Sequence, residues 1–249
     1  MSDEAARFAD ERRREASAMD ADAELKSLSR KWFDRSCQYR YSYNFTWLGR
    51  PIIQYPEDIV AMQELLWRVR PDLVIETGVA HGGSLVLSAS ILEMLGHGSV
   101  IGIDIDIRRH NRQAIEEHPL AKRIQLIEGS STDEKVIAEV MKRASNLERI
   151  VVFLDSNHTH EHVIGELDLY SPLVRKGSYL VVFDTVVEEM PDTAFSNRPW
   201  ARGNNPMTAV REFLGRNQRF VVDKEFEQRL QLSVAPSGYL RCVEDPDKR

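Results

Sequence analysis

The stretch DLVIETGVAHGGS, residues 72–84, decides the fold. An apolar run of strand length reaches Glu76, and Ser84 then opens a segment of helical length. Three glycines lie between them, Gly78, Gly82 and Gly83. Glycine is needed where the backbone takes a positive φ or comes close to a ligand. A strand that runs through such a loop into a helix is typical of a doubly wound α/β sheet, in which ligands bind at the carboxyl ends of the strands.

The same alternation of strand and helix continues along the chain. Four more β-branched runs, SVIGIDI, RIQLIEG, RIVVFLD and SYLVVFD, predict strands at residues 99–105, 123–129, 149–155 and 178–184. Helices are expected beside them at residues 84–95, 108–118, 132–144 and 160–174. Elements in this order build a mostly parallel sheet with helices on both faces. The sequence therefore predicts an α/β, Rossmann-like, doubly wound fold.

Further elements are expected at both ends of this core. Apolar residues at helical spacing predict a helix that starts after Pro56 and ends at Pro71. Ser131, followed by Glu134 three residues later, forms a capping box and predicts the start of the third helix. Beyond the fifth strand we expect a long loop at 185–206, a helix at 207–214, and closing strands at 220–224 and 230–234, the second extending toward Leu240.

The composition favours a globular protein outside the membrane. Of 249 residues, 42% are hydrophobic and 29% charged, and no apolar run reaches the roughly 18 residues that a spanning helix needs. The charged N-terminus lacks the apolar centre of a signal peptide, so we expect a cytoplasmic protein. Cys37 and Cys242 are then expected to be free thiols. The net charge of −6 argues against a nucleic-acid partner.

Residues 1–38 differ in composition from the rest of the chain. They are rich in Ala, Glu, Arg and Asp and hold few large apolar side chains. We expect a helical or partly disordered extension that packs on another subunit of a homo-oligomer. The catalytic domain is then expected at residues 39–249.

The loop after the first strand favours a ligand with positive charge. Its spacing is G-x-x-x-G-G, whereas the loop that binds a pyrophosphate reads G-x-G-x-x-G. Glu76, just before the first glycine, would repel a diphosphate but suits the amino group and sulfonium of S-adenosylmethionine (SAM). We expect Ser84, at the start of the helix, to belong to the same site.

The next two strands end in residues that suit a nucleoside. Asp104, with Asp106 as second choice, can accept hydrogen bonds from both ribose hydroxyls of SAM or of NAD. Ser130 or Ser131, after the third strand, can meet the adenine edge. Alternatively, Ser131 and Gly129 serve only as a helix cap and a turn.

The run VVFLDSNHTHEH, residues 151–162, ends the fourth strand with Asp155, and the fifth strand ends with Asp184. Adjacent parallel strands bring these carboxylates together, and a divalent cation with oxygen ligands would relieve their repulsion. Thr185, Asn157 or water can complete the ligand set. Alternatively, each aspartate caps the segment that follows it.

Three histidines follow Asp155, and they are not equivalent. His158 lies in the strand-to-helix turn and can take a proton from a hydroxyl polarised by the metal. His160 and His162 fall at the start of the next helix and are expected to be mostly structural. Positions i, i+2 and i+4 at a helix start do not converge, so a zinc site of three histidines is disfavoured.

Longer motifs resemble a known family. The run YNFTWLGRPIIQYPEDIVAMQELLWRVRPDLVIETGVAHGGS, followed by DSNH and YLVVFD, resembles the cephalosporin hydroxylase family of class I SAM-dependent methyltransferases over residues 39–243. The resemblance implies a seven-stranded sheet, SAM as methyl donor, and Mg²⁺ beside the acceptor. It also implies that the acceptor is a sugar hydroxyl of a glycan or a glycosylated natural product.

The resemblance also assigns individual residues. Residues that match the family's SAM site are Glu76, Gly78, Gly82 and Asp104. Asp155 and Asp184 match its metal carboxylates, arranged as in catechol O-methyltransferase, and His158 lies near the position of that enzyme's lysine base. One departure is Phe183, because several relatives carry glutamate just before the second aspartate.

A wall for the acceptor is expected from the loop SNRPWARGNNP, residues 196–206. Trp200 can stack on a sugar face, and Arg198, Arg202 or Asn204 can bond to hydroxyls or a phosphate. Alternatively, Trp200 is a packing anchor of the loop. Tyr43, Asn44 and Trp47 can close over the cofactor or pack in the core.

Three other functions compete with methyl transfer. An NAD(P)-dependent oxidoreductase is disfavoured by the glycine spacing and by the absence of a Tyr-x-x-x-Lys pair. An iron site of Asp155, His158 and His162 would explain a hydroxylase. A catalytically inactive SAM-binding protein is the third alternative, because of Phe183.

Overall fold

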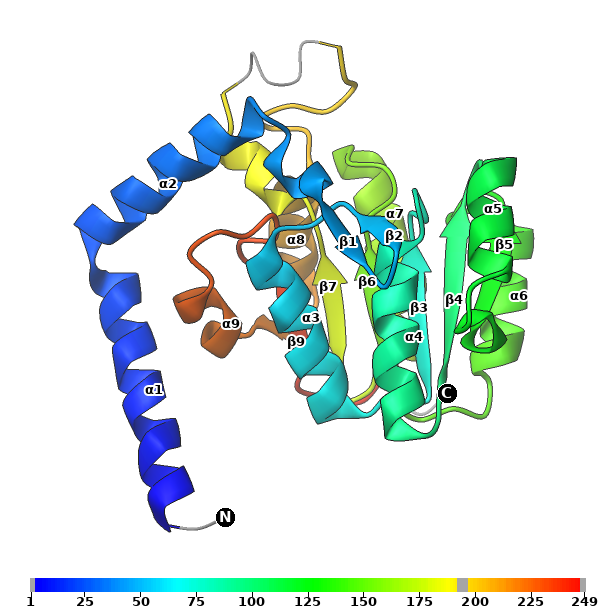
Figure 1. Cartoon of the computed structure of the whole chain (residues 1–249), viewed down its shortest axis with the longest axis horizontal. Helices are drawn as coiled ribbons and strands as arrows, with labels where there is room; N and C mark the ends of the chain where they lie inside the picture. The colour runs from blue at the N-terminus through cyan, green and yellow to red at the C-terminus, as the bar shows by residue number, and fades with distance from the viewer. Residues whose placement is uncertain (1–2, 192–196, 247–249) are drawn as a thin grey trace.

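A sheet layered between helices forms the body of the computed structural model, which describes residues 3–191 and 197–246 (Figure 1). The main sheet has seven strands in the order β5-β4-β3-β6-β7-β9-β8. In chain order the strands are β3 (Leu73–Thr77), β4 (Ser99–Asp104), β5 (Ile124–Glu128), β6 (Ile150–Leu154), β7 (Tyr179–Val182), β8 (Phe220–Val222) and β9 (Tyr239–Cys242). The pairs from β5 to β7 are parallel, whereas β9 runs antiparallel to β7 and β8. The expected Rossmann-like sheet is confirmed.

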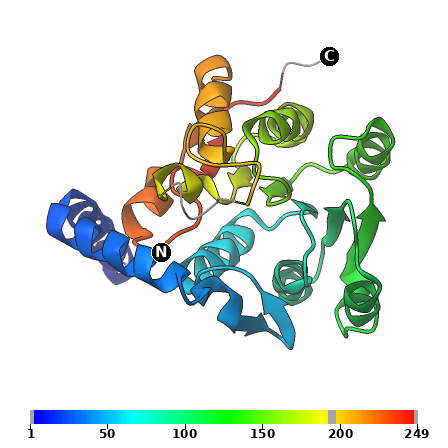
Figure 2. The same cartoon turned by 90° about the horizontal axis from the view of Figure 1, so that it is seen from above.

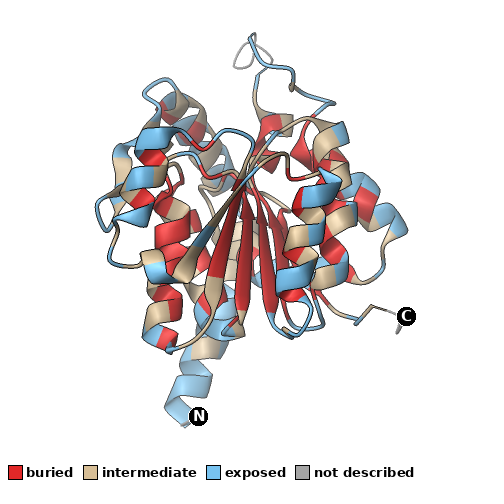
Figure 3. Cartoon of the chain, turned by 90° about the vertical axis from the view of Figure 1, so that its right-hand side faces the viewer, coloured by how far each residue is buried: buried red, intermediate tan, exposed pale blue. Residues whose placement is uncertain are grey.

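Helices cover both faces of the sheet, and Figure 3 shows the buried strands between the two helical layers. One layer contains α3 (Pro56–Val69), α4 (Gly83–Leu95), α5 (Arg109–Glu116) and α9 (Lys224–Arg229). The other contains α6 (Glu134–Ala144), α7 (His160–Tyr170) and α8 (Pro206–Arg216). Strand side chains alternate between the two cores. In β6, Val151 and Phe153 pack in the core with α3 and α4, whereas Val152 and Leu154 pack in the core with α7 and α8.

The order of the strands creates a crevice above β3. The chain passes from β3 to β4 and β5 on one side, and then to β6 and β7 on the other. The connection that follows β3 and the connection that follows β6 therefore run to opposite sides. They leave a crevice between them at the carboxyl ends of the strands, where such sheets bind ligands.

Two helices precede the sheet, α1 (Asp3–Ala21) and α2 (Ala23–Cys37). Figures 1 and 2 show both at one side of the molecule. No side chain of α1, all of whose residues are described, is buried, although α1 contacts α9. Helix α2 buries Phe33 and Ser36, and the Phe33 ring stacks on Tyr55 with centroids 4.9 Å apart. The extension is thus helical; its boundary at residue 38 and its role in an oligomer stay predictions.

A short two-stranded sheet links the extension to α3. The segment η1 (Tyr41–Asn44) leads into β1 (Phe45–Trp47), which pairs with β2 (Arg50–Ile52).

Within the described part of the chain, no helix is both long enough and apolar enough to cross a membrane.

Three local predictions were wrong. The N-cap of α6 is Asp133, whose side chain accepts from the Lys135 N–H, so Ser131 and Glu134 form no capping box. The second closing strand is β9 at Tyr239–Cys242, and residues 230–234 precede it without strand structure; the first closing strand, β8, ends at Val222, and α9 begins at Lys224. The expected loop after β7 begins with a 3₁₀ helix, η4 (Thr185–Glu189).

A buried carboxylate joins α3 to the C-terminal segment. Asp58 is fully buried and accepts hydrogen bonds from the Ser233 hydroxyl (2.7 Å), the Val234 N–H (2.9 Å) and the Tyr239 hydroxyl (2.8 Å). These bonds hold the chain beside the carboxyl end of β7.

Replacing Asp58 with alanine should destabilise the protein by about 3 kcal/mol or more, because it leaves buried donors without a partner. Chemical denaturation at pH 7 measures this change. The control is Val60→Ala on the exposed face of the same helix, for which we expect a loss below about 1 kcal/mol. Equal losses in the two variants would contradict this role of Asp58.

Candidate active site

The loop after β3 is shaped by its contact with β6. Gly78 has φ +90°, and a Cβ atom at this position would overlap the backbone carbonyl of Asp155. The Asp155 N–H donates to the Thr77 carbonyl (2.9 Å), and the Gly78 N–H donates to the Ile103 carbonyl (2.8 Å). The close contact with the end of β6 is therefore the first reason why position 78 requires glycine. Gly82, the N-cap of α4, also has a positive φ of 80°.

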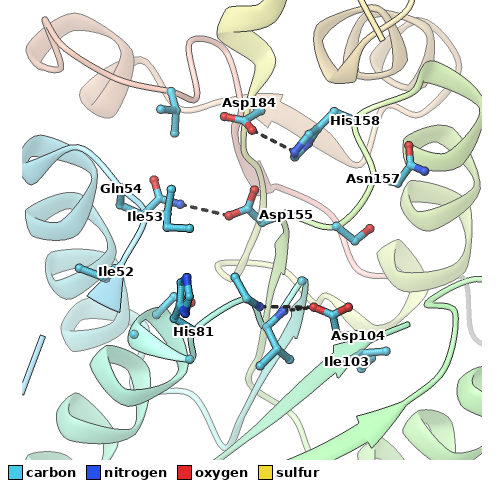
Figure 4. Close-up of a pocket in the computed structure, with 18 of the residues that line it drawn as sticks. Ile52, Ile53, Gln54, His81, Ile103, Asp104, Asp155, Asn157, His158 and Asp184 are labelled. Atoms are coloured by element: carbon cyan, nitrogen blue, oxygen red, sulfur yellow. Dashed lines mark hydrogen bonds and ion pairs between the residues drawn. The ribbon is translucent and has the colours of Figure 1, made fainter. Parts of the chain in front are cut away.

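Asp104 stabilises this loop from the end of β4. One carboxylate oxygen accepts from the backbone N–H groups of Val79 (2.8 Å) and Ala80 (3.3 Å), and the other accepts from the Asp106 N–H (3.2 Å). Figure 4 shows the carboxylate beside the loop, at the lower edge of the crevice. Asp104 thus lies where the sequence predicted it. Asp106, by contrast, is exposed and does not line the crevice.

Glu76 lies beneath the loop and does not line the crevice. Its side chain is 2% exposed, one carboxylate oxygen accepts from the Ser84 hydroxyl, and the other is buried without a hydrogen-bond partner. Burial raises the pKa of Glu76 to about 8, against the smaller opposing effect of the Ser84 hydrogen bond. An uncompensated buried carboxylate favours a cationic group nearby. Ser84, which does line the crevice, links Glu76 to it.

Ser131 meets α7 at the crevice. Its hydroxyl lies 3.0 Å from His162 Nε2, which also lies 3.1 Å from the Ser156 hydroxyl. The Ser156 hydroxyl in turn donates to the buried Glu166 (2.8 Å). His162, which the sequence predicted to be mostly structural, also lines the crevice. His160 is structural as expected, because its ring bonds to Thr208 and Glu212 of α8.

Asp155, His158 and Asp184 converge at the centre of the crevice (Figure 4). One ligand atom from each lies within 4.8 Å of the others, and His158 Nε2 is 3.1 Å from Asp184 Oδ2. Burial raises the pKa of Asp155 well above its ordinary value, and the charge of Asp184 raises it further. A cation between the carboxylates would relieve both effects. Asp155, His158 and Asp184 form the one group of three acidic, histidine or cysteine side chains, among the residues that the structure describes, whose ligand atoms are close enough to hold a metal ion.

The iron site considered for a hydroxylase is not formed. It needs Asp155, His158 and His162 on one open face. His162 instead bonds to Ser131 and Ser156, and Asp184 takes its place beside Asp155 and His158.

Sequence analysis missed Gln54. Its amide donates to Asp155 Oδ2 (3.3 Å), and its own carbonyl oxygen is buried without a hydrogen-bond partner. Gln54 is 2% exposed and lines the crevice. The available signal was a single polar residue between the apolar PII run and a helix-starting proline, which is not specific to a site.

Alternation along β7 explains Phe183. Side chains at odd positions of this strand point toward α3 and α4, so Phe183 is buried in that core, with its ring 5.9 Å from that of Phe153. Asp184 then takes a positive φ of 55°, which ends the extended backbone. Thr185 was wrongly predicted as a metal ligand, because its buried hydroxyl donates to the Pro236 carbonyl (2.6 Å) and it does not line the crevice.

The crevice contains two cavities. The first, of about 550 Å³, extends over the glycine loop, Asp104 and Ser131. The second, of about 710 Å³, extends toward α2 and η4. They share Ser42, Tyr43, Ser156, His158, Asp184, Trp200 and Val234. A ligand in the first cavity and a ligand in the second would therefore meet beside His158 and Asp184.

Trp200 is the principal wall residue predicted from the loop at 196–206, whose first residue lies outside the described part of the chain. Its ring meets that of His158 edge-on at 4.8 Å, and the Arg198 guanidinium lies 5.2 Å from the Trp200 ring centroid. Both residues line the second cavity. Arg202 and Asn204 were predicted as acceptor contacts, but they line neither cavity; Asn204 instead caps α7 by accepting from the His160 N–H (2.9 Å).

Three residues of the aromatic segment before α3, Tyr43, Asn44 and Trp47, have different surroundings. Tyr43 lines both cavities. Trp47 donates to the Ser90 hydroxyl (3.1 Å) and packs against the core, and Asn44 donates to the carbonyls of Arg40 and Tyr41. Only Tyr43 of these three, all of them described, can contact a ligand in the crevice.

Comparison with known proteins relates the chain to sugar methyltransferases. The profile of the family described as Rhamnosyl O-methyltransferase/CmcI matches residues 39–243. A rhamnosyl O-methyltransferase of Mycobacterium tuberculosis is 31% identical over 202 residues, which are 78% of this chain and 77% of that protein. The one from Mycobacterium leprae is 30% identical over 201 residues, 78% of this chain and 82% of that protein.

Solved structures share the fold. An apo structure of CmcI superposes with a TM-score of 0.57 at 20% identity, covering 81% of this chain and 77% of that chain. A CmcI structure with magnesium and SAM gives a TM-score of 0.55 at 19% identity, with the same coverage.

The pKa of Glu76 predicts how stability depends on pH. The unfolded chain releases this proton near pH 4.5 and the folded chain near pH 8. Between these values the folded state holds the extra proton, so this residue's contribution to the free energy of unfolding falls by a few kcal/mol as the pH rises. Glu76→Gln should remove this contribution to the pH dependence of the free energy of unfolding. Compared with the parent protein, the variant should therefore be more stable at pH 9 than it is at pH 5.

Denaturation midpoints of both proteins across pH 4–9 measure this effect. Glu161→Gln, an exposed position on α7, should leave the slope unchanged. A Glu76→Gln profile parallel to that of the parent protein would mean that Glu76 keeps its ordinary pKa.

Proposed function

The chain belongs to the Rhamnosyl O-methyltransferase/CmcI family, and from that membership we propose that it transfers a methyl group from SAM to a hydroxyl of a sugar within a glycoside or glycan. The family and the fold inferred from the sequence motifs are thereby confirmed, and so is the enzyme class, an O-methyltransferase. The observation that supports the reaction best is the position of His158 and Asp184 on the boundary of two cavities.

The first cavity suits SAM. Its volume is adequate for a nucleoside cofactor, the glycine loop leads into α4 along one side, and Asp104 and Ser131 are lining residues that would meet the ribose and the adenine. The partnerless oxygen of Glu76 suits a cationic ligand above the loop. Asp104 would accept from one ribose hydroxyl, because three of the about four acceptor sites of its carboxylate already bind the N–H groups of Val79, Ala80 and Asp106.

The carboxylates of Asp155 and Asp184 would hold a divalent cation beside the imidazole of His158. The carbonyl oxygen of Gln54, which has no hydrogen-bond partner and lies beside Asp155, is a third possible ligand, whereas Phe183 faces the core and supplies none. A bound Mg²⁺ supplies Lewis acidity that lowers the pKa of an acceptor hydroxyl.

His158 is the proposed base. With its Nε2 proton donated to Asp184 (3.1 Å), its Nδ1 lone pair is free to accept the proton of the acceptor hydroxyl. The edge-on contact with Trp200 restricts rotation of the imidazole. Methyl transfer is an in-line displacement, so holding the acceptor oxygen opposite the methyl group accounts for much of the rate.

Mycobacterial relatives are named for a rhamnosyl acceptor, so rhamnosides are the first acceptors to test. The alternative is a SAM-binding protein without transferase activity. It is favoured by one observation, which is that residue 183 is a phenylalanine buried in the core and supplies no carboxylate to the metal group.

Calorimetry and turnover test the two ligand sites separately. We expect SAM to bind the parent protein and Asp155→Ala alike, within about threefold in Kd, because Asp155 belongs to the metal group. Magnesium-stimulated formation of S-adenosylhomocysteine should be lost in Asp155→Ala only. Asp106→Ala, an exposed position next to the same cavity, is the matched control. SAM binding without turnover on any rhamnoside would favour the inactive alternative, and absence of SAM binding would refute the proposal.

The proposed base predicts a selective loss of rate. His158→Ala should lower kcat by about 10²-fold or more, as is usual when a general base is removed. The Kd for SAM should change little. His110→Ala on the exposed side of α5 is the control and should keep full activity. Undiminished kcat in His158→Ala would assign proton transfer to another group.

A further inference from the structure

A chain of polar side chains lies behind the wall of the first cavity. Glu166 of α7 is fully buried and accepts a hydrogen bond from the Ser156 hydroxyl (2.8 Å), whereas its second carboxylate oxygen has no hydrogen-bond partner among the described residues. His162 lies one helical turn before Glu166, with Nε2 3.4 Å from that carboxylate. The same nitrogen lies 3.1 Å from the Ser156 hydroxyl and 3.0 Å from the Ser131 hydroxyl. Neither His162 nor Glu166 has a role in the proposed methyl transfer.

The surroundings of His162 Nε2 decide which ring nitrogen carries the hydrogen. The Ser156 hydroxyl donates its proton to Glu166, so its oxygen can only accept from the imidazole. A lone pair on Nε2 would also face the Glu166 carboxylate at 3.4 Å, and two such acceptors repel each other. Nε2 therefore carries the hydrogen and shares it between the oxygens of Ser156 and Ser131.

This arrangement makes the Ser131 hydroxyl a donor toward the cavity. Its oxygen accepts from His162, so its own proton is left for a ligand, and no described protein group accepts it. Ser131 lines the first cavity and is 4% exposed. Its backbone is also held in place, because the Tyr170 hydroxyl donates to the Ser131 carbonyl (2.8 Å). A buried O–H group without an acceptor is costly, so this position favours a ligand that offers a lone pair.

The neighbouring serine is less suited to this role. Ser130 lines the same cavity, but its hydroxyl lies 3.1 Å from that of Thr132 and 3.4 Å from the Thr132 N–H. Its hydrogen bonds therefore stay within the turn after β5. Of the two serines that sequence analysis left open for the adenine, Ser131 has the hydroxyl that can donate to a ligand.

We propose that Ser131 selects the base of the cofactor by donating a hydrogen bond to a ring nitrogen of adenine, and that His162 and Glu166 hold Ser131 in this donor role. Adenine carries lone pairs at N1, N3 and N7, and a C–H group at the position that Ser131 meets would leave the buried O–H without an acceptor. His162 and Glu166 are positioning residues, because they act through Ser131. This inference rests on the proposed function, since it takes SAM to occupy the first cavity.

Analogues of S-adenosylhomocysteine test the contact. The 1-deaza, 3-deaza and 7-deaza compounds each replace one ring nitrogen with C–H. By calorimetry, one of them should bind the parent protein about fivefold or more weakly than S-adenosylhomocysteine. Ser131→Ala should bind that analogue and S-adenosylhomocysteine within about twofold. Equal binding of all four compounds to the parent protein, or the parent's ratio in Ser131→Ala, would overturn the inference.

Two amides at position 162 test the positioning role. Glutamine and asparagine both carry N–H donors, but the glutamine amide reaches about as far as imidazole Nε2, whereas the asparagine amide stops near Nδ1. His162→Gln should keep the parent's ratio of affinities for S-adenosylhomocysteine and the weak analogue. His162→Asn should lower this ratio at least about twofold, because the Ser131 hydroxyl can then turn to other acceptors.

The ratio distinguishes positioning from a merely structural role, which would weaken both compounds by the same factor. The control is His110→Asn on the exposed side of α5, which should keep the parent's ratio and both affinities. If His162→Asn also keeps the parent's ratio, His162 does not orient Ser131.

Turnover with a rhamnoside separates this inference from the proposed function. If the ratio depends on Ser131 but no rhamnoside is methylated, the adenine contact is supported and the transferase proposal fails. If a rhamnoside is methylated but Ser131→Ala keeps the parent's ratio, the transferase proposal is supported and the adenine contact fails. Absence of S-adenosylhomocysteine binding to the parent protein would refute both.

Discussion

The contact between the end of β3 and the end of β6 determines the rest of the site. Gly78 lies against the backbone carbonyl of Asp155, with no room for a Cβ atom. This single close approach sets the path of the glycine loop on one side and the position of the Asp155 carboxylate on the other. Because β3 is flanked by β4 and β6, the same contact lies at the point where the chain reverses its direction across the sheet.

Buried carboxylates give the crevice its chemical character. Glu76 and Asp155 are both placed where burial raises the pKa, and each lacks full compensation from neighbouring donors. Glu166 is also fully buried, with one oxygen that has no hydrogen-bond partner. Buried anions are costly unless they are paired or coordinate a metal. A cationic cofactor above the loop and a divalent cation between Asp155 and Asp184 would supply that compensation, which is why the site suits SAM and Mg²⁺ better than a diphosphate.

The predictions from sequence succeeded where a local pattern has one physical outcome. Short, continuous apolar runs form the strands. The acidic residues at the ends of these runs, Asp104, Asp155 and Asp184, therefore lie at one edge of a parallel sheet. The predictions failed where several local outcomes have similar energy. Ser131 and Asp133 are both good helix caps, but Asp133 caps α6, whereas the Ser131 hydroxyl lies beside His162. Thr185 follows Asp184 directly, but the 3₁₀ turn of η4 points its hydroxyl at Pro236.

The sequence by itself therefore determined the fold, the family and the order of polar residues along the strand ends, because continuous apolar runs and glycine spacing are local properties. Tertiary structure decided which side chains meet. Gln54 reaches Asp155 from 101 positions away, and α2 closes a cavity whose other wall is η4. Contacts of this kind depend on how helices pack against the sheet, and no spacing within a single segment reports them.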